Sequence, residues 1–200
     1  MRRVAWWGVV SSGLAPVFLI GGWTLAAARQ PAGFSSVRDT ISALAGLGAT
    51  DRWLMTGALV GVGLCHLVTA LSLRPAAGAG RVVLAIGGAA VIAVAAFPLP
   101  VQGSSSRHQV VAGISFVALA LWPALGWRRG PGVPWTFRPA LSIVVTLVLL
   151  ALDGWFAVGL SDARAGLAER VAAGAQSLWP FIAVLGARSG DRPPAAAPTV

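Results

Sequence analysis

The amino-acid sequence predicts an all-α integral membrane protein, a bundle of six transmembrane helices with both ends of the chain in the cytoplasm. Two features of the composition point to this fold class: 56% of the 200 residues are hydrophobic and only 10% are charged. A soluble domain carries about 25% charged residues, so charge this sparse cannot cover a water-exposed surface. In addition, the apolar residues form long blocks bounded by arginines, Pro/Gly turns or short polar stretches.

Each apolar block is close to the roughly 20 residues with which a helix crosses about 30 Å of hydrocarbon. The predicted spans are Val4–Ala28, Trp53–Leu73, Val82–Pro98, Gln109–Trp127, Pro139–Leu160 and Val171–Ala187. The third span is the shortest of the six. We expect a single membrane domain over residues 1–187, followed by a Pro/Ala-rich, disordered cytoplasmic tail at 188–200.

The arginines orient this predicted bundle. Nine arginines and one aspartate fall on the side of the N-terminus, against six arginines and four acidic residues on the opposite side. Cytoplasmic connections of membrane proteins carry such an excess of basic residues, so both termini are predicted to be cytoplasmic. The net charge of +9 therefore indicates contact with anionic membrane lipids, and we expect no nucleic-acid partner.

The remaining composition limits the chemistry. All 15 basic residues are arginine, and alanine and glycine are abundant, which is typical of a GC-rich bacterial genome and of a bacterial cytoplasmic (plasma) membrane protein. Cys65 is the only cysteine, so the chain has no intramolecular disulfide or thiolate cluster. Two histidines are too few for a typical metal site, and no phosphate-binding loop or haem motif occurs, so we expect no metal and no cofactor.

The first outer loop, Arg29–Arg52, is predicted to contain a short helix lying on the membrane surface. Ser36 and Asp39 have the spacing of a helix-capping pair. The apolar residues that follow fall on one helical face: Val37, Ile41, Leu44 and Ala45. Gly46 is placed to end this helix.

Small residues recur at intervals of four within the spans, a spacing that lets helix backbones approach closely in lipid. The pattern occurs at Gly57-x-x-x-Gly61, Ala85-x-x-x-Ala89-x-x-x-Ala93 and Ala168-x-x-x-Ala172. It favours a compact bundle but is too common to indicate a function.

Polar side chains inside a membrane are costly, so each one calls for a partner or a function. Asp153 lies about 10 Å inside the outer end of the fifth span, at ~1.5 Å per residue. Ser115 and Gln176 lie at a similar depth in the fourth and sixth spans. A second layer nearer the outer face is expected to contain Asp39, His108, Glu169 and Arg170.

Two interpretations of these layers stay open at this point. The polar groups either hold helices together, for example through a hydrogen bond between Asp153 and Gln176, or they converge on a ligand-binding or catalytic site. His66, a lone histidine in the second span, is interpreted as a packing group. The discriminating feature is whether the polar groups meet at an open cavity.

Several short motifs resemble the bacterial family called domain of unknown function 998. They are Arg38-Asp39-Thr40-Ile41-Ser42-x-Leu44, Arg52-Trp53-Leu54-Met55, Pro98, His108, Gly166-Leu167-x-Glu169-Arg170 and Leu178-Trp179. The resemblance covers about residues 10–187. It implies a multi-span membrane protein without an established activity, and it points to Ser42, His108, Glu169 and Arg170 as positions to test.

Three functional hypotheses follow. The first is a non-enzymatic bundle that binds membrane lipid or a partner, either another membrane protein or a second copy, with Asp39, Ser42, Ser115, Arg170 and Gln176 as candidate ligand-binding residues. The second is an enzyme acting on an outer-leaflet lipid or isoprenoid phosphate. There His108 would be the general base, with Asp153 or Glu169 orienting it and Arg170 binding phosphate.

The third hypothesis is a small transporter in which Asp153 relays a proton or cation. It requires a polar path into the cytoplasmic half, where the sequence offers mainly His66, Thr69 and Ser72 on the second span.

Overall fold

The computed structural model describes residues 4–189, and the regular secondary structure of this part of the chain is helical, without β-strands. The long helices are α1 (Trp6–Ala27), α3 (Trp53–Ser72), α4 (Gly78–Ala96), α5 (Ser106–Gly126), α6 (Pro139–Val158) and α7 (Ala165–Ser189). Two short elements accompany them, the single turn α2 (Ile41–Leu44) and the 3-10 turn η1 (Trp135–Phe137). Arg2, Arg3 and residues 190–200, most of the expected tail, lie outside the described residues.

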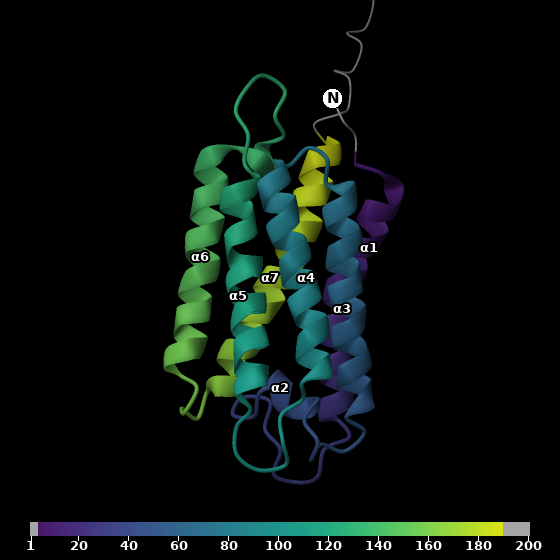
Figure 1. The fold of residues 1–200 in the computed structure, drawn as a ribbon, viewed down its shortest axis with the longest axis vertical. Coiled ribbons are helices and arrows are strands. Elements are labelled where there is room, and N and C mark those ends of the chain that lie inside the picture. Colours follow the sequence, from purple (N-terminus) through teal and green to yellow (C-terminus); the bar gives the residue numbers. More distant parts are fainter. Residues whose placement is uncertain (1–3, 190–200) are drawn as a thin grey trace, which may run out of the picture.

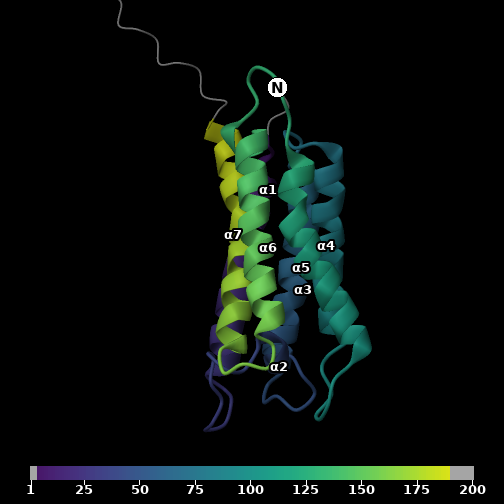
Figure 2. The ribbon, with the colours of Figure 1, turned by 90° about the vertical axis from the view of Figure 1, so that its left-hand side faces the viewer.

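The long helices run alternately up and down between two ends of the molecule (Figure 1). The start of α1 lies at one end, with the connection that contains η1. The first loop, between α1 and α3, and the connections at 97–105 and 159–164 lie at the opposite end, which we call the α2 end (Figures 1 and 2). Neighbouring helices form a closed ring in the order α1, α3, α4, α5, α6 and α7, because α7 packs against both α6 and α1.

Five helices, α1 and α3 to α6, are long and apolar enough to cross a membrane. These five correspond to the first five predicted spans, with ends shifted by a few residues. The sixth predicted span falls within α7, which is 25 residues long but less apolar. The two arginines that bound its apolar part, Arg170 and Arg188, and Gln176 in its middle lower its mean hydropathy.

Several glycines outside the four-residue pattern make close helix contacts. A methyl group on Gly63 would meet the carbonyl oxygen of Gly88, and one on Gly88 would meet that of Gly63, so α3 and α4 touch backbone to backbone. Gly80 of α4 approaches Gly126 at the end of α5 in the same way. Gly57, in contrast, faces open space.

The expected helix in the first loop is reduced to the single turn α2. Residues 35–39 form a separate turn, because the carboxylate of Asp39 accepts a hydrogen bond from the backbone N–H of Ser35 at 2.7 Å. Thr40 rather than Ser36 caps α2, with its hydroxyl accepting from the N–H of Ala43 at 3.1 Å. The expectation of a helix from Val37 capped by Ser36 was therefore wrong.

Candidate functional site

Glu169, on the first turns of α7, holds the first loop against the bundle. Its side chain is buried, with 3% of the residue exposed. One carboxylate oxygen accepts a hydrogen bond from the backbone N–H of Ile41, and the other accepts from the hydroxyl of Ser42 at 3.0 Å. Both oxygens of this buried acid are thus occupied by donors from α2.

Arg170 attaches the turn that precedes α2. Its Nη1 donates to the carbonyl oxygens of Ser36 and Asp39, both at 2.8 Å, and to that of Gly166 at 2.9 Å. Its Nε and Nη2 are buried and have no hydrogen-bond partner among residues 4–189.

The backbone of α7 reinforces this attachment. The N–H of Gly166 donates to the carbonyl oxygen of Arg38, and the N–H of Leu167 donates to that of Val37. A side chain at position 166 would collide with the carbonyl of Asp39, so this approach requires glycine. We refer to residues 35–45 as the lid segment, and to its bonds with Glu169 and Arg170 as the clamp.

Asp39 contributes to the clamp through its charge. Partial burial alone would raise the pKa of its carboxyl group, but hydrogen bonds from Arg38 and Ser35 and the charges of Arg38 and Arg170 outweigh burial and lower it. The Asp39 side chain is 29% exposed and pairs with Arg38 at 3.2 Å. It is therefore an ionised group that stabilises the turn from within the lid segment.

Asp153 and Gln176 form a separate arrangement deeper in the bundle. The side-chain Nε2 of Gln176 donates to the two carboxylate oxygens of Asp153 at 2.9 and 3.0 Å, and to the carbonyl oxygen of Phe116 at 3.0 Å. These bonds join α7 to both α6 and α5. The hydrogen bond expected between the two residues is present, and it links three helices.

His108 lies in a third arrangement. It is 5% exposed, and its ring Nδ1 lies 2.9 Å from the carbonyl oxygen of Phe97, so the side chain ties the start of α5 to the end of α4. The candidate catalytic residues His108, Asp153 and Glu169 thus bond to different partners, in three separate hydrogen-bonded arrangements. Ser115 also bonds within its own helix, donating to the carbonyl of Ala112 at 2.8 Å.

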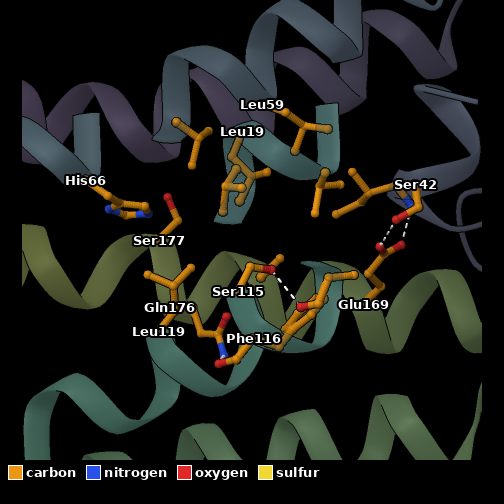
Figure 3. Close-up of a pocket in the computed structure, with 16 residues that line it drawn as sticks. Leu19, Ser42, Leu59, His66, Ser115, Phe116, Leu119, Glu169, Gln176 and Ser177 are labelled. Atoms are coloured by element: carbon orange, nitrogen blue, oxygen red, sulfur yellow. Dashed lines mark hydrogen bonds between the residues drawn. The ribbon is translucent and has the colours of Figure 1, made fainter. Parts of the chain in front are cut away.

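A cavity of about 60 Å³ lies inside the helix ring, beneath the lid segment. Figure 3 shows its polar groups spread along its length. Ser42 and Glu169 lie at the lid end and Ser115 and Gln176 near the middle (Figure 3). The rest of the wall is mainly apolar and comes from α1 to α5 and α7: Leu19, Ile41, Leu59, Val62, Val91, Val94, Ala112, Phe116, Leu119 and Ala173.

His66 and Ser177 lie at the far end of this cavity, pointing toward each other from α3 and α7 (Figure 3). His66 is fully buried and Ser177 is 2% exposed. Neither ring nitrogen of His66 nor the hydroxyl of Ser177 has a hydrogen-bond partner within residues 4–189.

The sequence interpretation treated His66 as packing and did not single out Ser177. The signal for Ser177 is its spacing: Glu169, Ala173, Gln176 and Ser177 lie at i, i+4, i+7 and i+8, on one face of α7.

Long apolar helices arranged in a closed ring define a multi-pass helical membrane protein. The chain belongs to the family described as "Protein of unknown function (DUF998)", which matches residues 13–186. This match confirms the resemblance found in the sequence motifs. No curated protein and no solved structure matches the chain.

Proposed function

We propose that the protein is a non-enzymatic bacterial plasma-membrane protein of six spans that binds an amphipathic lipid in the cavity beneath the lid segment. The α2 end faces outward and both termini are cytoplasmic. The observation that carries the proposal is the position of the cavity, which lies inside the ring and is covered by Ile41 and Ser42 of α2. In this reading, lipids of the outer leaflet reach the cavity when the lid segment moves.

The arrangement of the helices supports the topology. Taking α7 as the sixth span completes the ring, and its 25 residues are about 37 Å long at ~1.5 Å per residue, enough to cross about 30 Å of hydrocarbon. The end opposite α2 carries Arg74, Arg128, Arg129 and Arg138 in its connections and Arg81 in the first turns of α4. No acidic residue lies in those connections, so this end has the charge of a cytoplasmic face.

The chemistry of the cavity wall supports lipid binding. Leucine, valine and alanine side chains along its length suit an apolar chain, and the polar groups at the two ends can fix the orientation of a ligand. Pockets for small molecules usually have roughly 300–1,000 Å³. At about 60 Å³ the cavity is too small for a lipid, so the proposal requires displacement of the lid segment.

The lid segment is the part of the structure that moves in this proposal. It is joined to α7 by the hydrogen bonds of the clamp and by the backbone contact at Gly166, and its Ile41, Leu44 and Ala45 side chains belong to the buried apolar core. A lipid that displaces the lid segment must therefore replace both the hydrogen bonds and these apolar contacts.

The geometry gives less support to the other two hypotheses. An enzyme would need His108 near Asp153 or Glu169, and these residues bond to different partners. A transporter would need polar groups free to line a path into the other half of the ring. There, His66 and Ser177 lack hydrogen-bond partners within residues 4–189, but the hydroxyls of Ser11 and Thr69 lie 2.9 Å apart and join α1 to α3, and the hydroxyl of Ser72 bonds within α3.

Lipids bound to the purified protein test the proposal. The protein is purified in a mild detergent and bound lipids are measured by native mass spectrometry, for the wild type and for Ala173→Phe, which fills the cavity. Ala151→Phe, on an exposed face of α6, is the matched control. We expect one lipid to be retained by the wild type and the control and lost from Ala173→Phe. Equal retention in all three proteins would place the lipid outside the cavity and contradict the proposal.

A further inference from the structure

The far end of the cavity differs from every other part of its wall. Seven side-chain nitrogen or oxygen atoms within residues 4–189 are buried without a hydrogen-bond partner. Three of them, the two ring nitrogens of His66 and the hydroxyl of Ser177, belong to residues that line the cavity. The others belong to Trp122, Ser142 and Arg170, which do not line it.

Buried polar groups are almost always paired, because losing hydrogen bonds to water without a replacement is costly. A neutral imidazole offers one donor and one acceptor, and a serine hydroxyl offers one donor and two acceptor sites. His66 and Ser177 together can therefore both give and accept hydrogen bonds at a single place.

We propose that His66 and Ser177 form a recognition site for an uncharged hydroxyl or carbonyl group carried on an apolar chain. The ligand class is thus a long-chain or isoprenoid alcohol or carbonyl compound, with its polar group at His66 and Ser177 and its chain along the apolar wall toward the lid segment. The inference rests on the proposed lipid-binding function and names the chemistry of the lipid.

Charge distribution favours an uncharged group over a phosphate or an amine. Within residues 4–189, Glu169 is the only charged side chain that lines the cavity, and it lies at the opposite end with both oxygens engaged by α2. A phosphate beside His66 would find no arginine in the cavity wall, and an amine would find no free carboxylate. An ion that enters this apolar cavity without a counterion loses its hydration free energy, and no ion pair replaces it.

Photoreactive probes of equal chain length test this assignment in lipid nanodiscs containing the full chain. One probe is a diazirine-bearing octanol, the second a diazirine-bearing octane without the hydroxyl, and the third a diazirine-bearing octyl phosphate. After irradiation, labelled residues are mapped by mass spectrometry and normalised to labelling of the lipid-exposed face of α6. We expect the octanol to label cavity residues of α3 and α7 at least about fivefold more than the octane or the phosphate, as a neutral hydrogen bond allows.

Two variants and a matched control identify the residues responsible. His66→Leu and Ser177→Ala should each reduce the preference for octanol over octane at least about threefold, while labelling by octane persists. Ser142→Ala removes a buried hydroxyl that also has no hydrogen-bond partner within residues 4–189 but does not line the cavity. It should therefore leave the preference for octanol over octane unchanged.

The outcomes separate the two proposals. Cavity labelling by octane without any preference for octanol, or a preference that survives both variants, overturns the recognition site and leaves lipid binding standing. Absence of cavity labelling by all three probes overturns both. Preferential labelling by the phosphate overturns the assignment of an uncharged ligand.

Discussion

Glu169 accepts a hydrogen bond from the hydroxyl of Ser42 at 3.0 Å, across 127 residues of chain. The same carboxylate accepts a hydrogen bond from the backbone N–H of Ile41, so one side chain on α7 fixes both the position and the first turn of α2. Because Ser42, Ile41 and Glu169 all line the cavity, the contact that holds the lid segment is also part of the cavity wall.

Glu169→Ala should destabilise the protein by about 1–3 kcal/mol, because the buried N–H of Ile41 loses its acceptor. Glu169→Gln keeps one acceptor oxygen and should cost less. Thermal unfolding in detergent measures the change, and amide hydrogen exchange in residues 35–45 locates it. Asp162→Asn removes an exposed acid at the same end and serves as the control. Unchanged exchange in Glu169→Ala would contradict the clamp.

Arg170→Lys should loosen the lid segment although the charge is kept. The guanidinium Nη1 contacts three carbonyl oxygens, and a lysine ammonium on its different stem does not reproduce that geometry. We expect faster proteolytic cleavage in residues 33–40 and a loss of about 1–2 kcal/mol in stability. Arg164→Lys, an exposed position in the connection before α7, should match the wild type. Equal cleavage rates in both variants would argue against Arg170 as an anchor.

Acid should release the turn that contains Asp39. The pKa of Asp39 is lowered in the folded protein, so its stabilising effect is fully present above its ordinary pKa of about 3.9 and is lost as the pH falls through the lower folded value. The rate of amide exchange in residues 35–39, divided by the intrinsic rate at each pH, should be constant from pH 7 to about 5. This ratio should rise below about pH 4. Asp39→Asn should exchange faster at neutral pH and show no such rise; a rise of equal size in this variant would exclude Asp39 as the cause.

Gly63→Ala should destabilise the bundle, whereas Gly57→Ala on the same helix should not. A methyl group at position 63 meets the carbonyl of Gly88, and forced separation of packed helices typically costs about 1–3 kcal/mol. Position 57 has nothing within 4 Å, so alanine there should gain up to about 1 kcal/mol from its higher helix propensity. Thermal unfolding of the two variants checks the difference, and equal melting temperatures would contradict the contact between α3 and α4.

The long helices could be predicted from the sequence because hydropathy and length depend on residues close together in the chain. The family resemblance also drew attention to Ser42, Glu169 and Arg170, which the fold brings together. The Asp153–Gln176 hydrogen bond followed from equal depth in neighbouring spans.

Depth alone does not give the rotation of a helix about its axis, and this is where the sequence was insufficient. Ser115 lies at the predicted depth but bonds within its own helix, and His108 turns toward the end of α4. Ser177 and His66 line the same cavity because α7 packs against α1 and α3. The same rotation decides which small residues contact a neighbouring helix. The sequence alone therefore could not show that Gly63 contacts α4 and that Gly57 faces open space.

The clamp also orders events during biosynthesis. The lid segment leaves the ribosome well before its partners Glu169 and Arg170, which belong to α7. Until α7 is made, the ring is open between α6 and α1, and the carbonyls of Ser36 and Asp39 lack the arginine that binds them. Docking of α7 therefore closes the ring and seats the lid segment together, so the cavity cannot form before this helix has been translated.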